Sequence, residues 1–281
     1  MIVVGFLVAY DYALLQSSIP LVYAEANRII LSVDEHWLTW SGQPFSIKKD
    51  FYDWLAEIDT EHKIVWEKGN YADTSKNPLD NETQQRNDMF RNHPGYDWYI
   101  QLDADEYFIH FLPFVQYLQT IKDGQPVNVS VRLKTMYKQT ADTFFQIGGK
   151  METVGVATNH PTYTKARFIE QCKEIKTSFV LLHQSWGRSE NDVRRKLGNW
   201  GHRDDLNPER FLQAWKRCNK FTYALYRYFH PLHAPIWPYL EKVQADSIPA
   251  LIEHYRRQPP VEQPVPALSW PQKILKKILG I

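Results

Sequence analysis

The sequence predicts an α/β protein with a mixed, mostly parallel sheet flanked by helices and a helical C-terminal extension. Two observations support this fold class. Short apolar runs that suit buried strands alternate along the chain with segments that suit helices. Acidic residues follow three of these runs, at Asp11, Asp34 and Asp103, and an open α/β sheet binds its ligands beyond the carboxyl ends of its strands.

The first half of the chain carries the clearest alternation. It opens on a continuous apolar run, MIVVGFLVAY, of the kind that a strand needs when both of its faces are covered. We expect Ser17 or Ser18 to cap a short helix that continues through IPLVYAEAN. Further strands are predicted at residues 28–35, 62–68 and 97–102, and a helix at residues 82–93.

The second half is less regular. It offers strands at residues 127–137 and 176–183 and a helix that begins after Ser189. Residues 258–269 are rich in proline and predict a semi-rigid linker. Residues 270–281 separate apolar side chains from lysines around a helical wheel, which predicts a basic amphipathic helix.

The composition excludes several classes of function. The chain has 33 Lys and Arg against 32 Asp and Glu, a formal net charge of +1, so no overall field attracts nucleic acid. Cys172 and Cys218 lack metal-site spacing and form no disulfide framework, which favours a reducing compartment. No segment has transmembrane length, and the apolar N-terminus lacks the basic residues of an export signal. We therefore expect a cytoplasmic protein.

Three carboxylates stand together in the segment YDWYIQLDADEYF, residues 96–108. Burying charge at the end of a core strand is costly unless something compensates it. Asp103 and Asp105 are two residues apart, so in an extended segment their side chains project to the same side. Converging carboxylates suit Mg²⁺ or Mn²⁺, and the alternative is a solvated turn, where Asp is also common.

The surroundings of this motif resemble a known family. A first strand, a second strand ending in Asp34, a helix with QQRN and then WYIQLDADEYF are similar to the nucleotide-sugar half of GT-A glycosyltransferases, particularly family-2-like bacterial enzymes. The later LLHQSWGRSENDVRRKLGNWGH resembles their C-terminal part, so the resemblance covers residues 1–240. It implies a GT-A (Rossmann-like) domain over residues 1–257, with a nucleotide-sugar half at 1–110 and an acceptor half at 111–257.

The resemblance gives the acidic motif a role. Asp103 and Asp105 match the D-x-D motif, which holds a metal ion, Mn²⁺ or Mg²⁺, on the donor diphosphate; Asp105 is the better direct ligand. His183 ends a later apolar run. It is either a hydrogen-bonded structural residue or a third metal ligand, because neutral imidazole binds Mn²⁺ and GT-A enzymes often supply a late His.

The same resemblance implies which residues bind the donor. Asp34 matches the acidic residue that contacts the nucleoside. Tyr10 and Asp11 lie in the loop that also faces the nucleoside, although the usual Pro and Asn-Glu of that loop are absent. Arg86 lies where the family places a donor-binding basic residue. Arg188 precedes a predicted helix N-terminus, where a departing diphosphate is favoured.

An inverting transfer also needs a carboxylate base near the acceptor hydroxyl. The family's usual base motif is not recognisable here, so inversion follows from the resemblance alone. The candidates are Glu152, Glu190, Asp204 and Asp205, of which we take Asp205, beside His202.

Together these observations predict a hexosyltransferase-type enzyme that uses a nucleotide sugar, expected to be a UDP-sugar, and a glycan or lipid-linked acceptor. The basic C-terminal helix either packs its apolar face on the catalytic domain or binds an anionic membrane surface, which would then be a further partner on the inner face of the cell membrane. Two alternatives stay open. A metal-dependent phosphoryl or nucleotidyl transferase could use the same acidic pair, and a noncatalytic carbohydrate-binding protein would explain the 14% aromatic content.

Overall fold

The computed structural model describes residues 1–199, 207–259, 262 and 264–279. Two compact units make up the chain. The first contains Met1–Val131 and Thr153–Phe179, and the second contains Arg132–Glu152 and Val180–Ile281. Their boundaries differ from the predicted halves at 1–110 and 111–257, because the long strands β6 (Val127–Gln139) and β9 (Lys173–His183) each begin in the first unit and end in the second.

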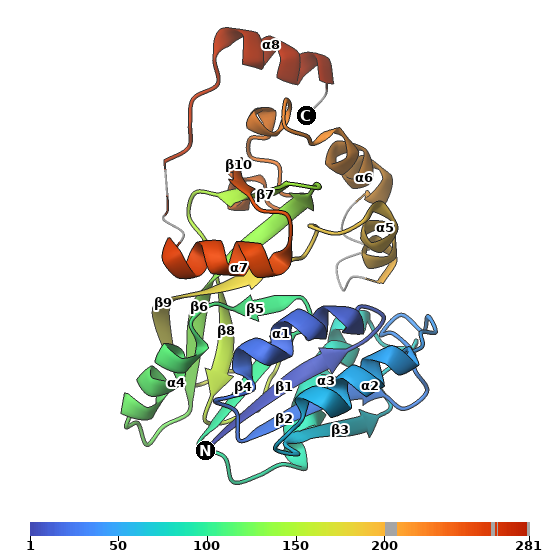
Figure 1. Cartoon of the computed structure of the whole chain (residues 1–281), viewed down its shortest axis with the longest axis vertical. Coiled ribbons are helices and arrows are strands. Elements are labelled where there is room, and N and C mark those ends of the chain that lie inside the picture. The colour runs from blue at the N-terminus through green and yellow to red at the C-terminus, as the bar shows by residue number, and fades with distance from the viewer. Residues whose placement is uncertain (200–206, 260–261, 263, 280–281) are drawn as a thin grey trace. The chain divides into compact units, whose positions relative to one another are not determined.

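The first unit is built on parallel strands (Figure 1). β1 pairs in parallel with β2 on one side and with β4 on the other, and β3 pairs in parallel with β2. β8 pairs antiparallel with β4, which gives the order β8-β4-β1-β2-β3. The predicted α/β class with a mixed, mostly parallel sheet is confirmed. The strands are β1 (Ile2–Val8), β2 (Arg28–Asp34), β3 (Ile64–Gly69), β4 (Trp98–Asp103) and β8 (Glu152–Thr158).

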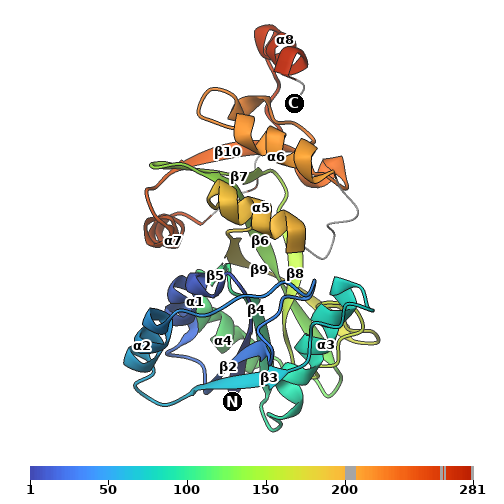
Figure 2. The ribbon, with the colours of Figure 1, turned by 90° about the vertical axis from the view of Figure 1, so that its right-hand side faces the viewer.

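Helices cover both faces of this sheet. Figure 2 shows α1 (Leu15–Val22) and α2 (Lys49–Ile58) on one side of the strands and α3 (Pro78–Arg91) on the other. Every residue of β1 is buried, as its continuous apolar run predicts. A further helix, α4 (Phe111–Thr120), contacts α1.

The helix α3 lies close against β1 because residue 5 has no side chain. A Cβ atom at Gly5 would lie 2.5 Å from Sδ of Met89 and 2.9 Å from Cζ of Phe90. Gly5 is also the sheet partner of Gln101 on β4. This close approach brings Arg86, which lies one turn earlier in α3, within hydrogen-bond distance of Gln101.

Two helices begin earlier than the sequence indicated. α1 begins at Leu15, so the prediction that Ser17 or Ser18 caps a helix was wrong. Ser18 lies buried inside the helix, where its hydroxyl donates to the carbonyl oxygens of Ala104 (2.7 Å) and Glu106 (2.9 Å). α3 begins at Pro78, since the side chain of Asn77 accepts the backbone N–H of Asp80 and proline is well tolerated in the first turn.

The second unit has its own antiparallel strands in the order β10-β7-β6 and an aromatic core that includes Tyr137, Trp186 and Trp215. Its remaining described strands and helices are β7 (Thr143–Gly148), α5 (Glu190–Asn199), α6 (Pro208–Arg217), η3 (Tyr223–Leu225), η4 (Ala234–Ile236), β10 (Tyr239–Gln244), α7 (Ile248–Arg257) and α8 (Trp270–Leu279). Within the described ranges, none of the helices is long and apolar enough to cross a membrane.

Candidate functional site

The predicted donor-site residues of the first unit meet at one edge of its sheet. β1, β2 and β4 are parallel neighbours, with Leu7 paired to Asp103 and Val8 paired to Val33. The loop after β1, with Tyr10 and Asp11, therefore lies at the same edge as the ends of β2 and β4. This is the placement that the carboxyl-end rule predicts.

Asp34, at the end of β2, organises the loop that follows it. One carboxylate oxygen accepts the backbone N–H groups of His36 (3.0 Å) and Leu38 (3.2 Å), and the other accepts that of Tyr71 (2.7 Å). The side chain is buried. Contact between Asp34 and a nucleoside, like that of Tyr10 and Asp11, stays a prediction.

The acidic motif itself is folded into a turn. β4 ends at Asp103, Ala104 and Asp105 form the turn, and β5 (Glu106–Phe108) begins directly afterwards. The expectation of an extended segment was therefore wrong: the hydroxyl of Ser18 donates to the carbonyl oxygens of Ala104, within the turn, and of Glu106, directly after it. Asp105 and Glu106 are only 4% and 3% exposed, so the alternative of a solvated turn does not describe them.

Arg86 of α3 provides the first countercharge. Its Nη2 donates to Oδ1 of Asp103 at 2.8 Å and to Oε1 of Glu82 at 2.8 Å, and its Nη1 donates to Gln101 at 3.2 Å. The guanidinium is 2% exposed. The structure thus shows Arg86 holding Asp103 in place; its binding of a donor stays a prediction.

Arg167 provides a second countercharge that sequence reasoning missed. Its Nη2 lies 3.1 Å from Oδ1 of Asp103 and 2.7 Å from Oε2 of Glu106, and Glu106 in turn accepts the backbone N–H of Asp103. Arg167 comes from the connection between β8 and β9, where Ala166 has a φ of 46° in the left-handed region. Such a residue gives no sequence signal for a site.

Side chains of α3 fix the connection that carries Arg167. Asn87 exchanges two hydrogen bonds with the backbone of Tyr163, at 2.9 and 2.7 Å. The hydroxyl of Thr83 accepts the N–H of Ala166 at 2.8 Å. One helix therefore supplies Arg86 directly and positions Arg167 indirectly.

This arrangement determines the charge state of Asp103. Partial burial by itself would raise the pKa of the Asp103 carboxyl, but the adjacent guanidinium groups of Arg167 and Arg86 hold that pKa well below its ordinary value. Asp105 acts in the opposite direction because two carboxylates repel each other. Asp103 is therefore ionised at neutral pH, as a metal ligand must be.

The cluster also fits a divalent cation by its overall charge. It contains four carboxylates, from Glu82, Asp103, Asp105 and Glu106, against the two guanidinium groups. Two buried polar atoms beside it, Nη1 of Arg167 and Oη of Tyr163, have no hydrogen-bond partner in the part of the chain that the structure describes. That same part brings together no group of three His, Cys, Asp or Glu side chains placed to hold a metal.

The remaining predicted residues belong to the second unit or are not described. His183 ends β9. Burial raises the pKa of the Glu152 carboxyl, against the smaller opposing effects of a hydrogen bond from Nε1 of Trp237 at 3.4 Å and of the nearby His183. Arg188 is buried just before α5. Asp205 and Asp204 lie outside the described residues. The roles of His183 and Arg188 stay predictions.

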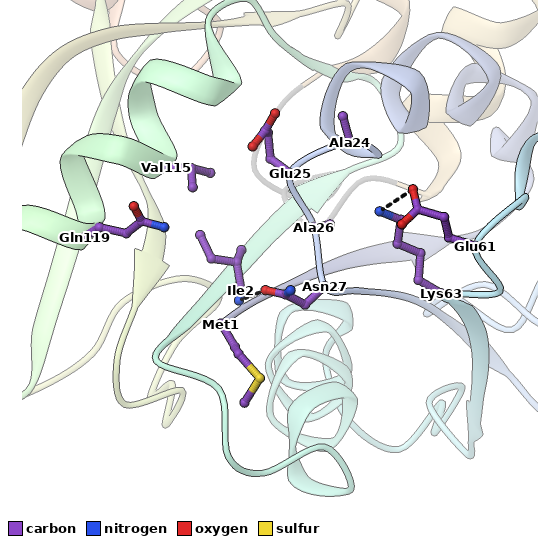
Figure 3. A pocket seen from close by; sticks show the side chains of 10 residues that line it. All are labelled: Met1, Ile2, Ala24, Glu25, Ala26, Asn27, Glu61, Lys63, Val115 and Gln119. Atoms are coloured by element: carbon purple, nitrogen blue, oxygen red, sulfur yellow. Dashed lines mark hydrogen bonds and ion pairs between the residues drawn. The ribbon is translucent and has the colours of Figure 1, made fainter.

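A pocket of about 540 Å³ lies at the opposite, amino end of the same parallel strands (Figure 3). Its rim includes Ile2, Asn27 and the ion pair between Lys63 and Glu61, at 3.2 Å. None of the residues that the sequence singled out lines it. This pocket therefore lies away from the acidic turn, whereas the buried charges gather at that turn.

Comparison with known proteins gives distant likenesses in fold. No family model matches the chain, and no curated protein matches it in sequence. HddC from Yersinia pseudotuberculosis is 12% identical with a TM-score of 0.36, covering 65% of this chain and 93% of that one, and it has also been solved in complex with GMP-PN. The inositol-1-phosphate CTP transferase from T. maritima is 7% identical with a TM-score of 0.35, covering 76% and 96%. TarS residues 1–349 from S. aureus are 10% identical with a TM-score of 0.30, covering 50% and 40%.

Proposed function

We propose that this protein is a metal-dependent glycosyltransferase that moves a sugar from a nucleotide sugar, a UDP-sugar in our expectation, to a hydroxyl of a glycan or glycolipid. The observation that supports the proposal is the acidic turn at the carboxyl edge of the parallel sheet. Asp103 and Glu106, on either side of this turn, are paired with two arginines that are almost fully buried. A chain that only needed a surface turn would gain nothing from burying so many charges.

In this proposal Asp103 and Asp105 would hold Mn²⁺ or Mg²⁺. His183, the third ligand that the sequence suggested, belongs to the second unit, and its part in the site stays a sequence prediction. The bound ion would offset the negative charge that develops on the departing diphosphate. Arg86 and Arg167 keep Asp103 ionised and oriented, so the site is ordered before the donor arrives. Asp34, Tyr10 and Asp11 would surround the nucleoside.

The acceptor hydroxyl must lose a proton to a carboxylate base if the transfer inverts configuration. Asp205 remains the proposed base. Glu152 is the second candidate, because burial raises the pKa of its carboxyl and a base is more effective when its pKa approaches the working pH. Replacing each with the corresponding amide and comparing turnover would distinguish them.

Metal-dependent nucleotidyl transfer is the second candidate function. The same acidic pair could hold its metal, and one distantly similar structure is named a CTP transferase, although that likeness concerns the fold alone. Such enzymes must cradle a triphosphate, for which glycine-rich loops are suited. The loop after β1, residues 9–14, contains no glycine and passes into η1 (Tyr12–Leu14), which favours glycosyl transfer.

One assay separates the two functions. Purified protein is incubated with a panel of sugar nucleotides and, separately, with nucleoside triphosphates plus sugar 1-phosphates, each with Mn²⁺ or with EDTA. Release of nucleoside diphosphate from a sugar nucleotide, abolished by EDTA, supports glycosyl transfer. Release of pyrophosphate in the second set would instead establish nucleotidyl transfer, and no turnover with either set would contradict both.

A further inference from the structure

The C-terminal helix α8 meets its own unit through polar groups. Nζ of Lys276 donates to the carbonyl oxygen of Arg227 at 3.1 Å, and Nη1 of Arg217 donates to that of Leu279 at 2.8 Å. Gln272, Lys276 and Leu279 are the partly buried positions of the helix. Gln272 and Lys276 are four residues apart, and Lys276 and Leu279 are three apart, so all three lie on one face of α8. This face lies toward the segment that contains η3.

The apolar residues of α8 lie on another face. Trp270, Ile274 and Ile278 are spaced four residues apart and therefore form one stripe along the helix. Trp270 and Ile278 are each 74% exposed, and Ile274 is 41% exposed. The helix is thus held to the protein by its polar face, while the stripe that would ordinarily be buried is left open to solvent.

The charges beside the stripe indicate what could cover it. Lys273 and Lys277 each precede a stripe residue, at 274 and 278, and lie on the adjacent row of the helix surface. Both are exposed. Carboxylates are absent from residues 264–279. An apolar stripe edged by lysines complements the acyl chains and anionic headgroups of a lipid surface, whereas a protein core would gain nothing from the lysines.

The segment that α8 contacts carries further apolar side chains. Phe221 is 78% exposed, Tyr228 53% and Leu232 40%. Lys220 lies 5.2 Å from the ring centroid of Phe221, which again pairs an exposed aromatic ring with a cation. Aromatic residues of this kind favour the boundary between water and lipid.

We propose that α8, through Trp270, Ile274 and Ile278 with Lys273 and Lys277, binds the protein to an anionic lipid bilayer, lying in the headgroup layer. The ten residues of α8 span about 15 Å at 1.5 Å per residue, which suits a helix that lies on a membrane and is too short for one that crosses it. This inference does not depend on the reaction that the first unit catalyses.

Flotation of the full chain with vesicles tests the proposal. Wild-type protein should float with vesicles that contain phosphatidylglycerol and much less with pure phosphatidylcholine. Trp270→Glu with Ile278→Glu should reduce binding about tenfold or more, since both apolar anchors become anionic. The matched control is Leu112→Glu with Phe168→Glu, two exposed apolar residues of the first unit, which should bind as wild type does.

A second pair of variants tests the charges. Lys273→Glu with Lys277→Glu should weaken binding to anionic vesicles about tenfold or more, whereas Lys49→Glu with Lys176→Glu, the same change in charge on exposed lysines of the first unit, should not. High salt should reproduce the loss by screening. Equal recovery of wild type with both kinds of vesicle would overturn the proposal, as would a wild-type dimer that Trp270→Glu with Ile278→Glu converts to a monomer without any vesicle binding.

Discussion

The two edges of the parallel sheet in the first unit place charge in opposite ways. At the amino edge, a pocket of about 540 Å³ is rimmed by a pair whose carboxylate partner, Glu61, is 64% exposed. At the carboxyl edge, Glu106 and Arg86 are 3% and 2% exposed, and each has at least one ionic partner. The amino edge has an open pocket beside one buried lysine with an exposed partner, whereas the carboxyl edge has several buried charges paired with one another. Buried charge indicates function better than a pocket does, because buried charges without a purpose can be replaced by apolar residues with no loss of stability.

The largest effect should come from breaking the network at the carboxyl edge. Arg167→Gln leaves Glu106 buried without its countercharge, so we expect the free energy of unfolding to fall by about 3 kcal/mol or more. Urea denaturation of the two proteins measures this difference. Arg167→Lys, which keeps the charge but loses the planar geometry, should recover part of the loss. A fall of less than about 1 kcal/mol in the unfolding free energy of Arg167→Gln would mean that these ion pairs stabilise the protein no more than a surface pair does.

Activity at this edge should respond to Asp105 without a matching loss of stability. We expect Asp105→Asn to reduce turnover by about 10²–10³-fold, because the proposed metal loses a charged ligand. Stability should hold, since the substitution removes repulsion between Asp105 and Asp103. Release of nucleoside diphosphate and the melting temperature are the two measurements. Asp123→Asn, at an exposed ion pair with Lys173, is the control, and full turnover in Asp105→Asn would refute the metal-centred mechanism.

The depressed pKa of Asp103 predicts a specific dependence of stability on acid. A carboxyl whose pKa is lower in the folded than in the unfolded chain contributes stability above its ordinary value of 3.8. That contribution should be lost as the pH falls below about 4. Denaturation midpoints between neutral pH and about pH 2 would show it, and Asp103→Asn should lack this part of the acid dependence. If the denaturation midpoint falls equally with pH in the wild type and in Asp103→Asn, the arginines do not lower the pKa of Asp103.

The smallest effect should come from the amino edge. Glu61→Gln removes an exposed partner of Lys63, which retains its position 4.5 Å from the ring centroid of Tyr23. Lys63 is buried but keeps its contact with the Tyr23 ring, so we expect the free energy of unfolding to fall by about 1 kcal/mol, less than in Arg167→Gln, and turnover to stay unchanged. If this variant instead lost activity, the pocket at the amino edge would be the better candidate for the functional site.

The contrast between the edges also explains what could be predicted from sequence. Continuous apolar runs identify strands that are covered on both faces, and the ends of such strands share one edge whenever the strands are parallel. Asp34 and Asp103 could therefore be placed at the same edge of the sheet before any coordinates were known. The helix α3 was predicted too, although from Glu82 instead of Pro78.

Contacts between distant segments could not be predicted in this way. Arg167 follows Asp103 by more than sixty residues and depends on a left-handed Ala166, which hydrophobic periodicity does not register. Ser18 looked like a helix cap because serine favours that position, whereas its hydroxyl binds the acidic turn from inside α1. That contact joins segments far apart in the sequence, so the turn at Ala104 and Asp105 could not be predicted from the local sequence either.

Gly5 has a consequence for how the protein can change in sequence. A Cβ atom at this position would lie 2.5 Å from Sδ of Met89 and 2.9 Å from Cζ of Phe90, so these side chains of α3 would have to shift. The helix α3 contains Arg86, which binds Asp103, and Thr83 and Asn87, which position the connection with Arg167. In a saturation-mutagenesis library selected for activity, position 5 should strongly favour glycine and tolerate alanine better than any larger residue, although residue 5 is not a predicted ligand of the site.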